Sequence, residues 1–265
     1  MQRAIGWVLI SFLFAGIAGC ASVGSKVDAG SQYFSVRIPT VQEETDYVWR
    51  TLGQLKFYKD NGYRPYLPSN TTVEELIGKA EKGQLVEADR TSLLETIKKD
   101  VYKEQDYTKA LWIVAGKLEL ADTALPRFEH FKSLWGFFIP RHYEIVLTLY
   151  GTGGSYDPEK GIIFLKTTAD GRFAKSENPL DTILHEAVHI GIDKVIVKRY
   201  GLPQWTKERV VDQFMMHNFQ DICPGYTLQR NPETLVDMYL QEPGVWDRLP
   251  SAIEEYVTSI SGNRM

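Results

Sequence analysis

The stretch 181-DTILHEAVHIGID-193 holds two of the chain's five histidines, four residues apart, with a glutamate directly after the first. Asn178 or Ser176 can cap a helix at this point. Pro179 suits the first turn of that helix, and Asp181 suits the positive end of its dipole. Because positions four apart lie on one face of a helix, the sequence predicts that both imidazoles point to the same side.

These residues fit the HExxH pattern of a metal-binding helix. His185 and His189 can both point at one cation, and Glu186 can touch a water on that cation without binding the cation itself. The alternative is a helix that places one histidine in the core and the other in solvent. Apolar residues flank the pair on both sides, so the helix is expected to be buried. Two buried imidazoles and a carboxylate need partners, which favours the metal site.

A third ligand is offered by the next helical stretch, 206-TKERVVDQF-214. Glu208 follows His189 by nineteen residues, and Asp212 lies four residues further on the same helical face. Together with HExxH, this stretch resembles the gluzincins, the thermolysin-like zinc peptidases. The resemblance implies that Glu208 completes a Zn²⁺ site with the two histidines. It also implies that Asp212 forms a hydrogen bond that orients His185.

The path between the two helices affects the choice of third ligand. If the histidine helix continued unbroken to the next turn, His189 would lie about 18 Å from that turn and Glu208 only about 7 Å from it. We therefore expect the helix to break at Gly191, with Asp193 as a new cap. Without that break, His217 would come level with the histidine pair and replace Glu208 as the ligand.

Three protein ligands leave a zinc ion an open position for water, which is the catalytic arrangement. Glu186 can take the proton of that water as it attacks a carbonyl, so we expect hydrolysis of a peptide or protein substrate. The resemblance also implies that substrate is held as an added strand at a sheet edge, for which residues 160–167 stand in the right place. A donor to the oxyanion is expected, with Tyr200 and Tyr226 as candidates.

The rest of the chain predicts helical parts on both sides of a small sheet. Residues 141–151 and 162–168 have the pattern of strands, and the glycine-rich loop between them is interpreted as a hairpin connection. We expect an α+β, zincin-like fold with a small sheet packed on the histidine helix. Residues 33–140 are expected to be mainly helical and 141–265 to hold the metal site, as two regions or as one domain. Candidate helices before the sheet are 41–60, 72–83, 89–105 and 107–122, with a Pro- and Tyr-rich loop at 61–70.

Residues 1–19 are expected to be a signal peptide, because Arg3 precedes an apolar run that is too short and too early to span a membrane comfortably. The run ends in 17-IAGC-20, which resembles the lipobox of bacterial lipoproteins. This resemblance implies lipid on Cys20, a lipidated tether over 20–32 and a place in the cell envelope. Ala21 and Ser22 follow the cysteine in place of an aspartate, and by resemblance to enterobacterial lipoprotein sorting this implies the outer membrane, facing the periplasm. An ordinary signal peptide or an uncleaved anchor is the alternative.

Composition and charge narrow the class of protein. The chain has 265 residues, is 43% hydrophobic and 24% charged, and carries a formal charge of -4. This length suits one large domain or two small ones. The mild acidity argues against nucleic acid as a partner. With Cys20 assigned to lipid, Cys223 remains alone and an internal disulfide is excluded.

Two alternative functions remain open. The first is a lipid-anchored envelope binding or structural protein, with a non-catalytic metal site or with a cleft blocked by the helical N-terminal half. Glu186 argues for an enzyme, because a structural site has no use for a carboxylate that does not bind the metal. The second is a hydrolase of cell-wall amides, since the sequence does not separate peptides from muropeptides.

Overall fold

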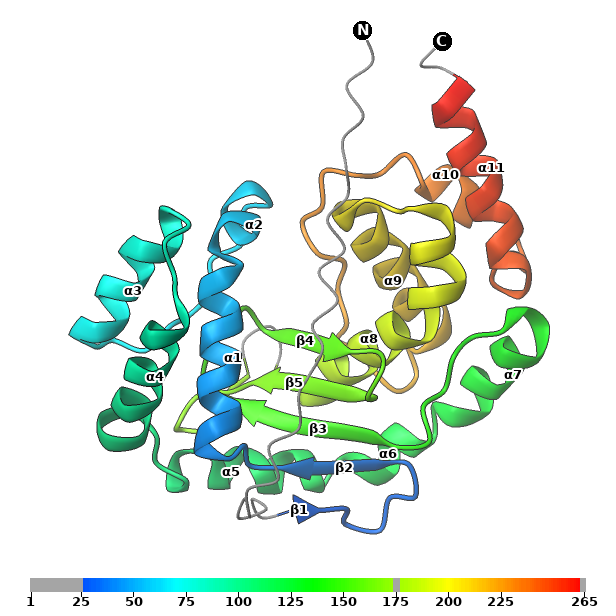
Figure 1. Ribbon diagram of the computed structural model, residues 1–265. Helices are drawn as coiled ribbons and strands as arrows, with labels where there is room; N and C mark the ends of the chain where they lie inside the picture. The colour runs from blue at the N-terminus through cyan, green and yellow to red at the C-terminus, as the bar shows by residue number, and fades with distance from the viewer. Residues whose placement is uncertain (1–25, 174–176, 263–265) are drawn as a thin grey trace, which may run out of the picture.

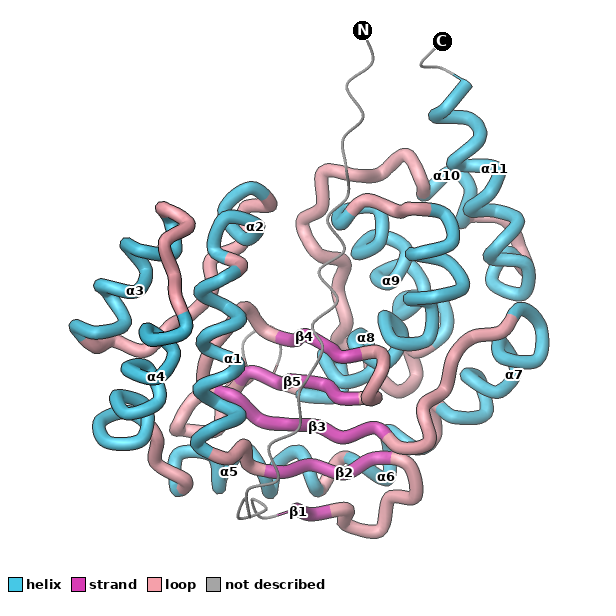
Figure 2. The backbone as a smooth tube through the Cα atoms, viewed as in Figure 1, coloured by secondary structure: helices cyan, strands magenta, loops and turns pink. Residues whose placement is uncertain are grey.

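The computed structural model describes residues 26–173 and 177–262, and its centre is a five-stranded sheet (Figures 1 and 2). The strands are β1 (Lys26–Val27), β2 (Phe34–Arg37), β3 (Tyr143–Thr148), β4 (Gly154–Asp157) and β5 (Ile162–Lys166). They lie in the order β1-β2-β3-β5-β4. The three central strands are parallel, and the two edge strands, β1 and β4, are antiparallel to their neighbours. The fold is therefore mixed α+β, as the sequence predicts.

The sheet lacks the predicted hairpin. The segments predicted as strands at 141–151 and 162–168 contain β3 and β5, but these two strands pair in parallel, with Ile145 opposite Ile163. The connection between them holds a further strand, β4, which runs back along the outer edge of β5. A parallel pair needs a long crossover, and residues 149–161 supply it. The hairpin prediction is wrong because β4 (GSYD) has too few apolar residues to show a strand pattern.

The segment before the first helix contributes to the sheet. β1 pairs with β2, and the hydroxyl of Ser31 donates to Asp122 at 2.8 Å. Residues 26–32 therefore lie against the body instead of forming a free tether. β2 is wholly buried and pairs with β3, so the sheet combines strands from both predicted regions of the chain. Cys20 and the predicted signal peptide lie outside the described residues.

Helices cover both faces of the sheet. Before β3 the chain forms α1 (Val41–Gly53), α2 (Leu55–Asp60), α3 (Thr71–Glu81), α4 (Glu87–Thr96), the π-helix η1 (Ile97–Val101), α5 (Gln105–Ala115), α6 (Leu118–Asp122) and α7 (Leu125–Trp135). After β5 it forms α8 (Pro179–Ile192), the π-helix η2 (Asp193–Lys198), α9 (Gln204–Asn218), α10 (Asp237–Leu240), the 3₁₀ helix η3 (Val245–Arg248) and α11 (Leu249–Gly262). In Figure 1, α1 crosses one face, whereas α5, α6 and α8 lie on the other. None of these described helices is both long and apolar enough to cross a bilayer.

Two apolar clusters hold this arrangement together. The larger lies between the sheet and α5 to α9, and it includes Phe128, Tyr143 and Val188. The smaller, around Tyr47 and Leu93, packs α1 against α3 and α4. Each large apolar side chain that is fully buried contributes roughly 1.5–3 kcal/mol. All 14 residues of α8 are buried, so the helix that carries the histidines is fixed by packing on every side.

Candidate metal centre

Helix α8 brings the two imidazoles together. The side chain of Asn178 caps the helix by accepting from the backbone N–H of Leu180 at 3.4 Å, and Pro179 occupies the first position. His185 and His189 are one helical turn apart, and their Nε2 atoms lie 3.0 Å from each other. Their residues are only 4% and 1% exposed. The predicted helix therefore forms and presents both rings to one buried point.

Glu208 reaches the same point from α9. Its Oε2 lies 3.3 Å from Nε2 of His189 and 3.4 Å from Nε2 of His185. Its other oxygen, Oε1, accepts from the side-chain amide of Gln204 at 2.7 Å and lies 3.4 Å from the ammonium of Lys207. One ligand atom from each of the three residues lies within 4.8 Å of the others, so this buried group could hold a metal ion. Two imidazole nitrogens and a carboxylate oxygen are a donor set that suits Zn²⁺.

The chain stays helical from α8 to Tyr200, and the turn to α9 follows at residues 201–203, so the predicted break at Gly191 is absent. After Ile192 the α-helix passes directly into the π-helix η2. Asp193 has helical backbone angles and lies 2.8 Å from the ammonium of Lys198, so it does not cap a new helix. Gly191 is explained by packing instead, because a Cβ at this position would lie 1.9 Å from the ring of Phe137.

Glu208 nevertheless reaches the histidines, and the expectation that an unbroken helix would exclude it is wrong. The expected distances apply to two straight α-helices, whereas a π-helix places more residues in each turn and so covers less length per residue. His217, the competing ligand, is exposed, and its Nδ1 donates to the carbonyl of Gln213 at 2.8 Å. The structure therefore places Glu208, and not His217, beside the pair.

A hydroxyl stands between His185 and the acid that was expected to orient it. The hydroxyl of Tyr226 lies 2.6 Å from Nδ1 of His185 and donates to Asp212 at 2.6 Å. Asp212 itself is 3.7 Å from that nitrogen, so it acts through the tyrosine. The backbone N–H of Gln229 also donates to Asp212 at 2.8 Å, and its side-chain amide donates to Glu208 at 3.2 Å. The loop that carries Tyr226 and Gln229 thus fixes two of the three candidate ligands.

Glu186 faces the edge strand of the sheet. It is 5% exposed, and a Cβ built on Gly154 of β4 would lie 2.3 Å from its Oε1 and 2.6 Å from Cγ2 of Thr182. Two residues along the strand, the ring of Tyr156 stacks on the ring of His189 with centroids 5.0 Å apart. The carboxylate next to the first histidine therefore lies between the metal-binding group and β4.

β4 is the edge strand beside the site, in place of the predicted segment. It pairs with β5 on one side and with no other strand in the part of the chain that the structure describes. Residues 160–167 contain β5, which pairs on both sides, so the prediction that they form the substrate edge is wrong. The carbonyl of Gly153 accepts from Lys166 of β5 at 2.8 Å. Because backbone groups alternate along a strand, those of Gly154 and Tyr156 point away from β5.

A tyrosine from the helical first half of the chain also reaches the site. It lies in the loop at residues 61–70, which we name the strap. The hydroxyl of Tyr63 accepts from the amide of Gln204 at 3.3 Å, and that amide also donates to Glu208. Burial, with the negative charges of Glu208 and Glu186, raises the pKa of Tyr63 to about 12. Its phenol therefore remains a proton donor at neutral pH.

The two tyrosines proposed from the sequence as oxyanion donors, Tyr226 and Tyr200, have surroundings that do not suit that role. Tyr226 donates its proton to Asp212. Tyr200 packs against the larger apolar cluster, and its buried hydroxyl has no hydrogen-bond partner among the described residues. Tyr63 was missed because it is far away in sequence, and its position in a Pro- and Tyr-rich loop gave no sign of what it faces.

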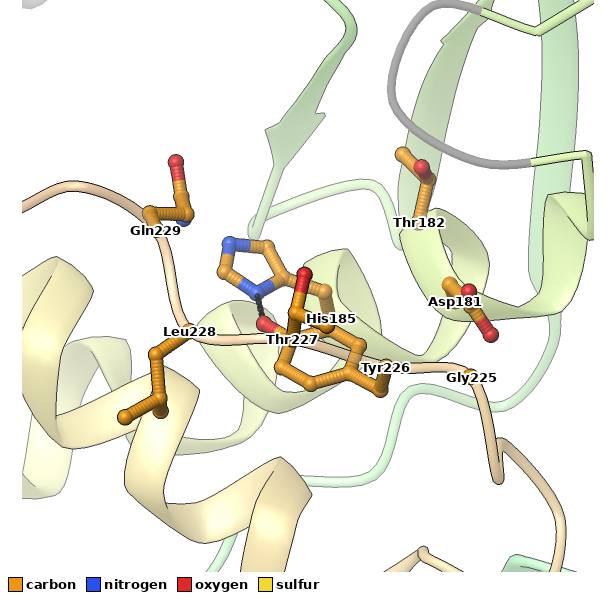
Figure 3. Close-up of a pocket in the computed structure, with 8 residues that line it drawn as sticks. All are labelled: Asp181, Thr182, His185, Gly225, Tyr226, Thr227, Leu228 and Gln229. Atoms are coloured by element: carbon orange, nitrogen blue, oxygen red, sulfur yellow. Dashed lines mark hydrogen bonds between the residues drawn. The ribbon is translucent and has the colours of Figure 1, made fainter.

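A pocket of about 230 Å³ opens beside His185 (Figure 3). Thr182 lines it from α8, and the loop at 225–229 lines it with side chains that include Tyr226 and Leu228. Figure 3 shows the hydrogen bond from the ring of His185 to Tyr226 at the centre of this lining. The pocket is partly polar and partly apolar, and it lies on the side of the site where α8 begins.

The protonation states of the site suit metal binding. Burial lowers the pKa of His189 to about 3, so its ring is neutral and its Nε2 can act as a ligand. Burial opposes the charge of Glu208, but its interactions with His189, its hydrogen bond to His185 and the charge of Lys207 outweigh burial and hold its pKa well below the ordinary value. A neutral imidazole and an ionised carboxylate are the forms that bind a cation.

Comparison with protein-family models, with curated proteins and with solved structures finds no match. The residues and their geometry therefore carry any inference about function. Within the described residues, the site is assembled from α8, α9, β4, the strap and the loop at 225–229.

Proposed function

We propose that the protein is a zinc-dependent hydrolase, most simply a peptidase with a zincin-like metal centre. The convergence of His185, His189 and Glu208 at one buried point, with Glu186 held between them and an edge strand, carries the proposal. Each of these residues was predicted from the sequence, and Glu208 lies nineteen residues beyond His189. The resemblance to the gluzincins supports the same conclusion, because it involves the same four side chains.

The chemistry follows from the side chains around the centre. Bound Zn²⁺ would supply a Lewis acid that acidifies water and polarises a carbonyl. Glu186 takes the proton of the attacking water and delivers it to the leaving amine. Tyr63 donates a hydrogen bond to the oxyanion that forms on the carbonyl. Tyr226, backed by Asp212, keeps His185 in one orientation.

The edge strand gives a peptide a place to bind. The outward backbone groups of Gly154 and Tyr156 can pair with an extended peptide, as in other cases of strand addition. That peptide would lie beside Glu186, and the pocket next to His185 would take the side chain that follows the cleaved bond. We also propose that the protein is exported and anchored to the cell envelope through lipid on Cys20.

Replacement of Glu186 by glutamine tests the proposal. Glutamine keeps the size and hydrogen bonding of the side chain but removes the base. We expect one equivalent of bound zinc in both proteins, and hydrolysis at least about a hundredfold slower in the variant. The measurements are zinc content by elemental analysis and turnover of a peptide library, both on protein that begins at residue 21. Glu159→Gln, a change of an exposed carboxylate, is the matched control and should retain full activity.

Two outcomes would contradict the mechanism. In one, Glu186→Gln loses its zinc, which would make Glu186 a ligand. In the other, the variant holds zinc and cleaves as fast as the wild type, which would exclude it as the base. If the wild-type protein binds zinc and cleaves nothing, the alternative of an envelope binding protein would gain support.

A further inference from the structure

The strap is anchored to the sheet next to the start of β4. The backbone N–H of Tyr66 donates to the carbonyl of Gly151, and the N–H of Gly151 donates to the carbonyl of Tyr66, both at 2.8 Å. The ring of Tyr66 lies parallel to that of Tyr150, with centroids 6.4 Å apart. Gly151 precedes β4 by three residues, and Gly154 is the residue that meets Glu186. The strap therefore stands at the Gly154 end of the edge strand.

The other end of the strap contacts α9. The ring of Tyr63 stacks on that of Trp205 at the start of α9, with centroids 5.1 Å apart and an angle of 23° between the planes. The hydroxyl of Tyr63 bonds to Gln204 on the same helix. The strap thus connects the sheet to α9, and the side chains of the site below it are almost fully buried.

The direction of a bound peptide follows from the strand. Antiparallel pairing is slightly more stable per residue than parallel pairing, so a peptide on β4 is expected to run from the Asp157 end to the Gly154 end. Its carboxyl terminus then points at Tyr66. With about 3.4 Å per residue, the three positions from Gly154 to Gly151 leave about 10 Å between Glu186 and the strap.

We propose that the strap blocks the Gly154 end of the edge strand, so that the enzyme removes at most about three residues from the carboxyl terminus of a peptide. The proposal rests on the peptidase function inferred above and defines its substrate class. One water cleaves one peptide bond, leaving a shortened chain with a new carboxylate and releasing a fragment with a new amine. A continuous chain cannot pass the strap, whereas a chain end can stop before it.

A positive charge beside Tyr66 would favour the binding of a terminal carboxylate. The ammonium of Lys166 lies 5.0 Å from the centre of the Tyr66 ring and forms no ion pair with a described residue. Partial burial lowers the pKa of Lys166, and a bound carboxylate would favour its charged form again. A carboxylate that reaches Tyr66 therefore meets the ammonium of Lys166.

Three matched peptide libraries test the proposal on zinc-loaded protein. The first is N-acetylated with a free carboxylate, the second has the same sequences as carboxyl-terminal amides, and the third is circular. We expect cleavage within three residues of the free carboxylate, at least tenfold lower kcat/KM for the amides, and no cleavage of the circles. Mass spectrometry of the products identifies each cut. Cleavage of the circles at a comparable rate, or cuts deeper than three residues from the end, would overturn the proposal.

Substitutions in the strap and in β5 test the barrier and the carboxylate contact without changing the proposed catalytic residues. Tyr66→Pro removes the N–H that bonds to Gly151 and should gain cleavage of the circular library, whereas Tyr66→Phe should not. Lys166→Gln should abolish the preference for a free carboxylate over an amide, and Lys160→Gln, at the other end of β5, should keep it. If Tyr66→Pro leaves the circles intact, the strap is not the barrier. Zinc-loaded protein that cleaves no library would overturn the hydrolase function itself, and this inference with it.

Discussion

Replacement of Gly154 by alanine tests whether Glu186 acts from its place beside β4. A Cβ at this position would lie 2.3 Å from Oε1 of Glu186 and 2.6 Å from Cγ2 of Thr182, whereas ordinary contacts begin near 3.4 Å. The carboxylate must therefore retreat by about 1 Å, and a displacement of this size in a catalytic group can lower the rate about a hundredfold. The three atoms nearest to the new methyl group belong to Glu186 and Thr182 and not to a proposed zinc ligand, so zinc content should remain unchanged.

The same substitution also has a cost in stability. The methyl group of Thr182 cannot move as easily as the end of a glutamate side chain, because a β-branched residue has few allowed rotamers. Overpacking of this kind costs about 1–3 kcal/mol. For a chain of this size, each kcal/mol lowers the melting temperature by about 2–4 °C. We therefore expect a folded variant that melts several degrees below the wild type.

The assay combines peptide turnover, zinc analysis and thermal unfolding at one protein concentration. Gly78→Ala in α3 is the matched control, since a Cβ at that position meets nothing within 4 Å. Alanine also favours a helix over glycine by up to about 1 kcal/mol, so this control should be at least as stable as the wild type. Gly154→Ala with activity within about threefold of the wild type would refute the reasoning, since a group that tolerates this displacement is not the base.

Three further predictions concern other parts of the site and the fold. Tyr63→Phe keeps the stacked ring but removes the hydroxyl, so kcat should fall about 10²- to 10³-fold with zinc content unchanged; an unaltered kcat would exclude Tyr63 as a donor. Tyr226→Phe removes the link between Asp212 and His185, and zinc affinity measured by chelator competition should weaken about 10- to 100-fold. Glu44 is buried against β3, and burial raises its pKa from 4.5 to about 7. The folded state then retains a proton that the unfolded chain loses above pH 4.5, so stability is greatest below that pH and decreases by on the order of 3 kcal/mol as pH rises to 7. Glu44→Gln should remove this slope in urea unfolding measured at pH 5 and pH 8, and an unchanged slope would identify another group.

The sequence predicts those parts of the site that depend only on spacing and capping within one helix. The spacing of His185 and His189 fixes a shared face only because the segment is helical, and the cap at Asn178 indicates where that helix begins. Glu208 and Asp212 follow the same spacing rule on the next helix. Whether these side chains bind zinc or catalyse a reaction is a matter of chemistry, and it remains a prediction.

The features that the sequence does not predict depend on contacts between distant segments. Gly191 was interpreted as a helix break, but it is small because Phe137 packs against it. β4 has no recognisable pattern, since its position depends on pairing with β5 and on the close approach of Gly154 to Glu186. Tyr63 reaches the site only because the strap crosses from the first half of the chain. Tertiary packing decides each of these positions, and a short stretch of sequence does not show which distant residues will pack against it.

The burial of the site and its proposed activity are compatible because the two anchors of the strap differ in strength. At α9, Tyr63 contributes one ring stack and one hydrogen bond, each worth about 0.5–1.5 kcal/mol. Release of this contact therefore costs on the order of 1–3 kcal/mol, which leaves the open form populated at roughly 0.5–15%. At the sheet, Tyr66 has two backbone hydrogen bonds and a stacked ring, and it is expected to remain in place. A peptide can then enter as Tyr63 moves away, while Tyr66 still limits how far its carboxyl end extends.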